Sequence, residues 1–349
     1  MLIERLLSET SASQNLAVFV AVATVVWLSG TRLAQLIDAL ADRLKLAKSL
    51  MGLLVLSLAT SLPEVATTLS AALRQNQSLV LNNLFGGIAL QTAILATADL
   101  WAPGAITNYP RKANHALEAT LLMMLMAMML IVIVLGEPVS FGPVGLGGIV
   151  IAIAYCGTIY LLRRYDDASD WVPVDLPDET PVPLQVLSIS ADTSTRMIIM
   201  QSVAACVAIL VFGLALVASA EAVAETTGLG AGFIGVTLLA AATSMPELST
   251  TIAAVRLGAY TMAISNIFGS NLIMLVLVLP ADMLFTRGPI LAGVGTTAML
   301  SICFGMLVTA IFIMGMIWRR KPRMGRLGID SGLVILAYLA SLWIYYQIR

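Results

Sequence analysis

Ten apolar segments constrain the fold of this chain more than any other feature. A helix needs about 20 apolar residues to cross the hydrocarbon core of a bilayer, and each segment has roughly that length. Only 11% of the residues are charged, and most of these lie between the segments. The expected spans are 15–40, 49–74, 78–101, 114–135, 143–162, 197–224, 231–256, 260–284, 289–318 and 331–348. The pattern predicts an all-α polytopic membrane protein with ten transmembrane helices.

One long polar connection separates the first five spans from the last five. The segment 163–196 carries seven acidic residues and four prolines, a composition typical of a solvated linker. We therefore expect a first five-helix unit over 1–163, an acidic cytoplasmic linker over 164–195 and a second five-helix unit over 196–349.

The distribution of lysine and arginine predicts the orientation in the membrane. With the N-terminus outside, fourteen basic residues fall in inner loops and four fall outside. Cytoplasmic loops of membrane proteins are enriched in these residues. We expect a multi-pass protein of the cytoplasmic (inner) membrane with both termini outside, in contact with the lipid bilayer.

The two halves are related by an internal repeat. The sequence Ala-Thr-Ser-Leu-Pro-Glu at 59–64 returns as Ala-Thr-Ser-Met-Pro-Glu at 242–247, an offset of 183 residues. Over 59–88, 11 of 30 positions are identical at this offset, and Asp99 matches Asp282 further along. Each unit holds five spans, an odd number, so the second unit enters the membrane upside down. Inverted repeats with interrupted helices and a midplane site are a recurring plan of secondary transporters.

Each copy of the motif places a carboxylate, Glu64 or Glu247, inside an apolar segment. A charge there costs roughly 3 kcal/mol, which marks a functional site. The proline before each glutamate leaves the carbonyl four residues back, on Ala59 or Ala242, without a helical partner. Hydroxyls, carbonyls and carboxylates are the hard oxygen ligands that hard cations prefer. The other members of the predicted cation site are Thr60 and Thr243, four residues before the glutamates, with Ser61, Ser244, Asn83 and Asn266.

Two carboxylates close together in the membrane need compensating charge. A divalent cation, two monovalent cations or protons can each supply it. The segments Asn83–Gly87 and Asn266–Asn271 bring amides that coordinate or cap and small residues that permit close helix packing. A purely structural glycine-rich turn is the alternative for these two segments.

Other classes of function have no support in the sequence. The single histidine, His115, follows Arg111 and Lys112 and is interpreted as a surface residue. No nucleotide-binding loop, Ser/His/Asp set or zinc-type cluster is present in the sequence. We therefore expect no enzyme activity, no cofactor, no nucleic acid and no obligate protein partner, with inorganic cations as the bound species.

The two motifs, each followed by Asn-x-x-Gly, resemble the α-repeats of the sodium/calcium exchanger branch of the calcium:cation antiporter superfamily. The resemblance covers about 30–102 and 213–285. It implies alternating-access exchange of Ca²⁺ for Na⁺. It also implies Ca²⁺ binding by Glu64, Glu247 and the backbone oxygens of Thr60 and Thr243, and Na⁺ binding by Ser61, Ser244 and Ser270. Gln91 joins the predicted cation site through the same resemblance.

The chain departs from the family pattern at three positions. Gly87 replaces a hydroxyl residue, and Gln91 and Met274 stand where the family usually has Asn or Asp. Two alternatives therefore remain open. One is an H⁺-coupled exchanger of Ca²⁺ or another divalent cation, and the other is a membrane sensor or scaffold that no longer transports.

Overall fold

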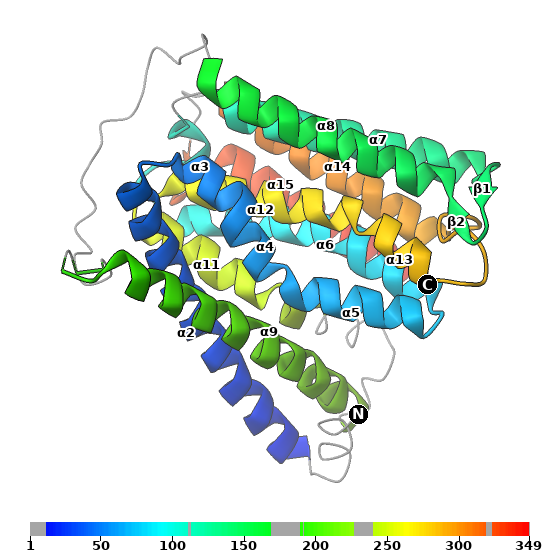
Figure 1. The fold of residues 1–349 in the computed structure, drawn as a ribbon, viewed down its shortest axis with the longest axis horizontal. Coiled ribbons are helices and arrows are strands. Elements are labelled where there is room, and N and C mark those ends of the chain that lie inside the picture. The colour runs from blue at the N-terminus through cyan, green and yellow to red at the C-terminus, as the bar shows by residue number, and fades with distance from the viewer. Residues whose placement is uncertain are drawn as a thin grey trace.

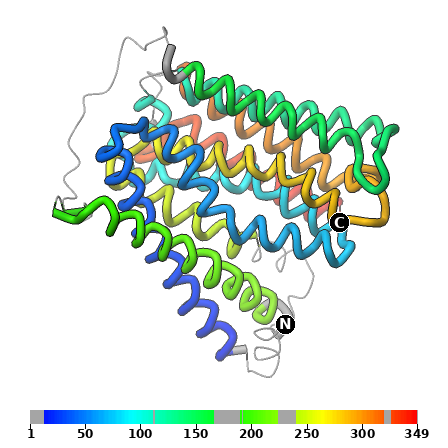
Figure 2. The backbone as a smooth tube through the Cα atoms, viewed as in Figure 1, coloured from blue at the N-terminus to red at the C-terminus, as the bar shows by residue number. Residues whose placement is uncertain are grey.

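The chain forms a bundle of long helices, seen in a computed structural model that describes residues 12–110, 113–168, 189–190, 192–226, 240–318 and 323–348. Most helices run side by side in one body, while α2 and α9 pack on each other and cross this body at an angle (Figure 1). The tube in Figure 2 shows that these two helices run in opposite directions. Reversed direction is what an inverted repeat requires of equivalent helices.

The first half consists of one long helix, one broken span and three further helices. Their bounds are α2 Ala12–Leu44, α3 Lys48–Leu50, a π-helical turn at Met51–Leu56, α4 Ser57–Thr60, α5 Leu62–Leu73, α6 Gln77–Ala98, α7 Asn114–Leu135 and α8 Leu146–Ala168. Short 3₁₀ turns follow α6 at Asp99–Trp101 and Ile106–Asn108. A two-stranded hairpin, β1 Ser140–Phe141 and β2 Val144–Gly145, joins α7 to α8.

The second half repeats this order of elements where it is described. Its helices are α9 Thr195–Thr226, α11 Met245–Arg256, α12 Tyr260–Val276, α13 Val278–Leu284, α14 Thr296–Ile317 and α15 Ile329–Gln347. The hairpin of β3 Arg323–Met324 and β4 Leu327–Gly328 joins α14 to α15. Each of its strands lies 183 residues after the corresponding strand of the first hairpin, so the repeat extends beyond the motif that reveals it.

The described residues contain eight helices that are long and apolar enough to cross a membrane, and the broken pair Lys48–Thr60 and Leu62–Leu73 makes a ninth. The protein is thus an all-α polytopic membrane protein. Predicted span 114–135 coincides with α7. Predicted span 231–256 lies partly outside the described residues, as does most of the linker 164–195, so ten spans and the proposed unit boundaries stay predictions.

Two aspartates fix the hairpins to the helical body. The Asp99 carboxylate accepts hydrogen bonds from the amides of Ile106 and Gly328, both at 2.6 Å. The Asp282 carboxylate accepts from the amides of Ile290 at 2.6 Å and Gly145 at 2.7 Å. Each aspartate therefore holds the hairpin of the opposite half.

Glycines allow α2 and α9 to pack closely against the helices that carry the two motifs. A Cβ on Gly30 of α2 would collide with the Ser249 side chain of α11, and one on Gly213 of α9 would lie 2.5 Å from Cγ of Pro63. Gly30 and Gly213 are 183 residues apart. The two halves therefore touch through equivalent, glycine-dependent contacts.

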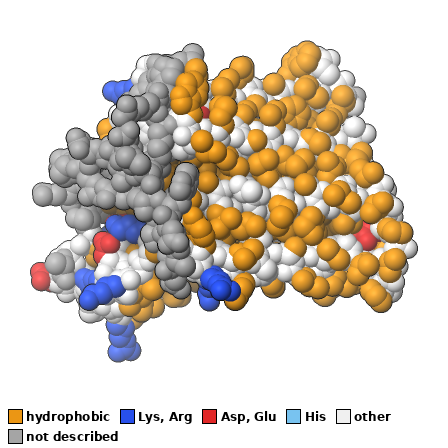
Figure 3. Space-filling model, turned by 90° about the horizontal axis from the view of Figure 1, so that it is seen from above, with side chains coloured by type: hydrophobic (Ala, Val, Ile, Leu, Met, Phe, Trp, Pro, Cys, Tyr) orange, Lys and Arg blue, Asp and Glu red, His pale blue; other side chains and the backbone are white. Residues whose placement is uncertain are grey.

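The surface matches a protein that lies in lipid. Among the described residues, hydrophobic side chains cover much of the face in Figure 3, while lysine and arginine side chains gather toward one end. An apolar surface with basic residues toward one end fits a protein that lies in a bilayer.

Candidate cation-binding site

The first motif breaks its helix where the sequence predicts. α4 ends at Thr60 and α5 begins at Leu62, with a bend of 49° between the two parts of the span. Ser61 donates its amide to the Ser57 carbonyl at 3.0 Å and accepts from the Val65 amide at 2.9 Å. Because Pro63 has no N–H, it cannot donate the usual helical hydrogen bond to the Ala59 carbonyl, four residues back.

The second motif has the same geometry. The Ser244 amide donates to Ala240 at 3.1 Å, and the Leu248 amide donates to Ser244 at 3.0 Å. Pro246 has no N–H, so it cannot donate the usual helical hydrogen bond to the Ala242 carbonyl, four residues back. Each proline thus leaves carbonyl oxygens next to a glutamate.

The two glutamates lie together in the interior. Glu64 is 3% exposed and Glu247 is 0% exposed, and their carboxyl groups are close enough to interact electrostatically. The Ser61 hydroxyl donates to Oε1 of Glu247 at 3.5 Å, a long bond that joins the halves. Both carboxylate oxygens of Glu64 and Oε2 of Glu247 are buried without a partner among the described groups. Buried oxygens without donors are expensive unless a ligand satisfies them.

The motif hydroxyls divide into two groups. Those of Thr60 and Thr243 bond back to their own helices, to the carbonyls of Ser57 at 3.2 Å and Ala240 at 3.0 Å. Ser270 on α12 keeps a fully buried hydroxyl without a partner among the described groups. Ser244 is 3% exposed and lies just before α11, whose first turn contains Glu247.

Asn83 and Asn266 hold the motif helices rather than project both polar atoms into the site. The Asn83 amide donates to Thr68 at 2.8 Å and more weakly to Thr67 at 3.4 Å, and the Asn266 amide donates to Thr250 at 3.2 Å. The side-chain oxygen of Asn266 remains buried without a partner among the described groups.

Sequence reasoning missed Thr67 and Thr250, although they are identical at the repeat offset. The Thr67 hydroxyl donates to the carbonyls of Pro63 and Glu64, at 2.9 and 3.0 Å. The Thr250 hydroxyl makes the same contacts with Pro246 at 2.8 Å and Glu247 at 3.2 Å. The two threonines therefore fix the backbone that carries the glutamates.

A further polar group lies between α6 and α12. Gln91 is fully buried, and neither of its amide atoms has a partner among the described groups. Asn271, which the sequence-derived site omits, donates to Thr92 at 3.4 Å and leaves its oxygen without a described partner. Met274 is fully buried on the same helix as Asn271. The chain thus keeps amide oxygens here even though its departures from the family pattern remove others.

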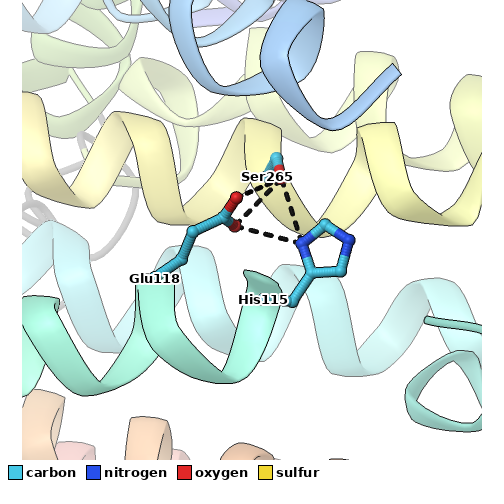
Figure 4. A network of polar contacts seen from close by, with 3 residues as sticks. All are labelled: His115, Glu118 and Ser265. Carbon is cyan, nitrogen blue, oxygen red and sulfur yellow. Dashed lines mark hydrogen bonds and ion pairs between the residues drawn. The ribbon is translucent and has the colours of Figure 1, made fainter. Parts of the chain in front are cut away.

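The interpretation of His115 as a surface residue is wrong. It lies at the start of α7, 3% exposed, and its Nδ1 is 3.1 Å from Oε2 of Glu118 and 3.1 Å from the Ser265 hydroxyl (Figure 4). The Ser265 hydroxyl donates to the Glu118 carboxylate at 2.9 Å. Ser265 directly precedes Asn266, so this network ties α7 to the site-bearing part of α12.

The arrangement around Glu64 and Glu247 is suited to a hard cation. It offers carboxylates, hydroxyls, amide oxygens and freed carbonyls, whereas the described residues contain no group of three or more histidine, cysteine or acidic side chains placed for a metal. Oxygen-only sites favour cations such as Ca²⁺ and Na⁺ over softer metals.

Several known proteins are similar to this chain in sequence or in fold. The inner membrane protein YrbG of Escherichia coli K12 is 28% identical over 316 residues, which cover 82% of this chain and 86% of YrbG. The sodium/calcium exchanger MaX1 of Methanosarcina acetivorans is 37% identical over 83 residues, 24% of each protein. A solved structure of the sodium-calcium exchanger NCX_Mj superposes with a TM-score of 0.69 at 16% identity, covering 95% of this chain and 98% of that one, and so shares the fold. The model of the sodium/calcium exchanger protein family matches residues 14–163 and 197–347, which shows two repeats. With both repeats matched, the chain belongs to the sodium/calcium exchanger protein family, whose members are cation antiporters of the membrane.

Proposed function

We propose that this protein exchanges Na⁺ for Ca²⁺ by alternating access at the site between its two motifs. The observation that carries the proposal is the pair of buried carboxylates, Glu64 and Glu247, three of whose four oxygens have no hydrogen-bond partner among the described groups. One Ca²⁺ balances both charges. Two Na⁺ ions balance them as well, so the two kinds of ion compete for one site.

The family resemblance supports the remaining ligands. The backbone oxygens of Thr60 and Thr243 complete a Ca²⁺ shell with the two glutamates, and the hydroxyls of Ser61, Ser244 and Ser270 supply oxygens for Na⁺. Gln91 and the side-chain oxygens of Asn266 and Asn271, which have no hydrogen-bond partner among the described groups, are further candidate ligands.

The orientation and location belong to the proposal. We place the protein in the cytoplasmic membrane with both termini outside, because the basic residues then fall in the inner loops. The opposite directions of α2 and α9 support an inverted repeat, which lets the site open to either side.

Proton coupling is the second candidate, and Met274 and Gln91 favour it. Met274 is fully buried and offers only a thioether, and Gln91 is uncharged, so fewer charged oxygens surround a Na⁺ ion. Two protons balance Glu64 and Glu247 as well as one Ca²⁺ does.

Calcium titration of the purified protein by calorimetry tests the site. The wild type should bind Ca²⁺ saturably with a stoichiometry near one, and Na⁺ should weaken the binding. Glu64→Gln removes one of the two charges and should weaken Ca²⁺ binding at least about a hundredfold, on the order of 3 kcal/mol for a charged ligand. The thermal stability of the Glu64→Gln variant should not fall, because the substitution removes a buried charge that has no partner among the described groups.

Asp42→Asn is the matched control, because Asp42 is an exposed carboxylate at the end of α2. It should bind Ca²⁺ like the wild type. Equal Ca²⁺ affinities of Glu64→Gln and the wild type would remove Glu64 from the site.

A further inference from the structure

Arg32 lies in the apolar helix α2 without a carboxylate partner. Its guanidinium donates to Oε1 of Gln201 on α9 at 2.8 Å and to Oε1 of Gln35 at 3.3 Å, both neutral amides. Within the described ranges no carboxylate forms an ion pair with Arg32, and the nearby Asp38 is paired with Lys48 at 2.6 Å. A guanidinium has five N–H donors, so donors and charge remain available.

The arginine opens onto a groove between α2 and α9. The groove has a volume of about 420 Å³ and is lined by Leu28, Ser29, Arg32, Gln201, Ala204 and Ala205. Its polar side combines a guanidinium, an amide and a hydroxyl, and its other side is aliphatic. This chemistry suits a ligand with a negatively charged group joined to a hydrocarbon chain.

The groove lies within an arginine side chain's reach of the phospholipid headgroups. Arg32 lies six residues before Asp38, about 9 Å along the helix, and Gln201 lies five residues after Arg196, about 8 Å along α9. The groove is therefore one to two turns below the first charged residues of both helices. At that level an arginine reaches the phosphates of the leaflet.

We propose that the groove between α2 and α9 binds the phosphodiester of an anionic phospholipid, with Arg32 as the main contact. Two phosphate oxygens accept from the guanidinium, and the Ser29 hydroxyl is placed to donate to the same group. One acyl chain lies against Leu28 and Ala204. A zwitterionic headgroup fits less well, because its ammonium finds no carboxylate among the lining residues.

This inference goes beyond the transport proposal and does not depend on it. The groove does connect to the site, since Gly30, two residues before Arg32, packs against Ser249 and the Pro246 carbonyl of α11. A lipid between α2 and α9 therefore contacts the helix pair that rests on both motifs.

Native mass spectrometry of the purified protein, titrated with phosphatidylglycerol or phosphatidylcholine, tests the proposal. The wild type should retain phosphatidylglycerol more strongly than phosphatidylcholine. Arg32→Gln should weaken phosphatidylglycerol retention about tenfold, the effect of losing a charge-assisted hydrogen-bond pair. Arg164→Gln, which removes an exposed arginine from α8, is the matched control and should retain the lipid like the wild type.

Two further variants keep the test decisive if Arg32→Gln folds poorly. Arg32→Lys keeps the charge but loses the two-pronged donor geometry, and should show intermediate retention. Ala204→Trp fills the groove without changing any charge, and should weaken retention as strongly as Arg32→Gln.

Three outcomes would overturn the proposal. The first is equal phosphatidylglycerol retention by the wild type, Arg32→Gln and Ala204→Trp. The second is equal retention of phosphatidylcholine and phosphatidylglycerol by the wild type. The third is displacement of the lipid by soluble glycerol phosphate at comparable concentration, which would assign the groove to a free anion.

Discussion

Glu137 is a buried carboxyl group just outside the membrane spans, at the turn between α7 and β1. It is 8% exposed, and its Oε2 accepts from the Gly147 amide at 3.1 Å. Burial raises the pKa of the Glu137 carboxyl above its ordinary value, the Gly147 amide lowers it, and the nearby Asp282 carboxylate raises it. The folded protein therefore binds this proton more tightly than the unfolded chain does.

This shift predicts a pH dependence of stability. The stabilising contribution of Glu137 is complete below the ordinary pKa of 4.5 and is lost as the pH rises through the higher folded pKa. The thermal midpoint of the wild type in detergent should thus fall as the pH rises above about 4.5. In the Glu137→Gln variant the side chain at position 137 cannot titrate but still offers an oxygen to the Gly147 amide. The thermal midpoint of this variant should therefore lack the part of the pH dependence that Glu137 causes. A Glu137→Gln curve that parallels the wild type would contradict the assignment.

At the scale of single residues, the sequence predicts the site better than its surroundings. Glu64 and Glu247 are recognisable because a carboxylate in an apolar membrane helix is energetically costly and therefore indicates a function. His115 is not, because a histidine beside basic residues looks like a loop residue, and only packing brings Ser265 of α12 against it. The sequence contains no local signal for a contact between residues 150 positions apart.

Among the elements, the prolines mark the helix breaks. Pro63 lies two residues after Ser61, where the second span bends, and Pro280 lies four residues after Val276, where α12 ends and α13 begins. The π-helical turn Met51–Leu56 and the two hairpins carry no equally clear signal in one sequence. Their form depends on contacts such as that of Gly52 against the Met262 carbonyl, which arise only when the halves pack.

The aspartate contacts predict matched effects in the two halves. Asp99 and Asp282 each accept two backbone amides, and asparagine at either position offers only one acceptor atom to them. Asp99→Asn and Asp282→Asn should each destabilise the protein by about 1–3 kcal/mol, because an amide N–H then lies buried without an acceptor. Thermal unfolding in detergent measures this, with Asp42→Asn as a control of wild-type stability.

The comparison of the two variants is the sharper part of this test. Because the contacts are related by the repeat, the two losses should be similar. A loss confined to one variant would show that only one hairpin is held by its aspartate.

For the whole molecule, the open question is the ion that drives exchange. A Cβ on Gly87 meets no described atom within 4 Å, so a serine fits there, whereas Met274 is fully buried. The double variant Gly87→Ser with Met274→Asp restores a hydroxyl and a carboxylate on the helices that line the site. If Na⁺ drives the wild type weakly, this variant should raise Na⁺-dependent Ca²⁺ flux several-fold.

The control for this variant is Gly157→Ser, because Gly157 is an exposed glycine of α8 whose Cβ position is also open. It should leave the flux unchanged. Unchanged Na⁺ dependence in the double variant would mean that these positions do not limit Na⁺ binding.

The whole-molecule proposal also depends on an arrangement that the sequence predicts only in outline. The offset of 183 residues and the odd number of spans per half predict an inverted repeat with the two motifs facing each other. The Ser61 hydroxyl of the first motif contacts Glu247 of the second, so the two motifs lie together. The crossing of α2 and α9 over the body was not predictable, because it depends on the glycine contacts of Gly30 and Gly213 with the opposite half.

Calcium flux in proteoliposomes, with Na⁺ and H⁺ gradients imposed separately, tests the central claim most directly. An outward Na⁺ gradient at equal pH should drive ⁴⁵Ca²⁺ into vesicles containing the wild type, and vesicles with Glu64→Gln or Glu247→Gln should show only the leak of empty vesicles. Uptake driven equally by a pH gradient without Na⁺, and indifferent to added Na⁺, would contradict Na⁺ coupling and leave the proton exchanger. Saturable Ca²⁺ binding with no flux under either gradient would contradict transport itself.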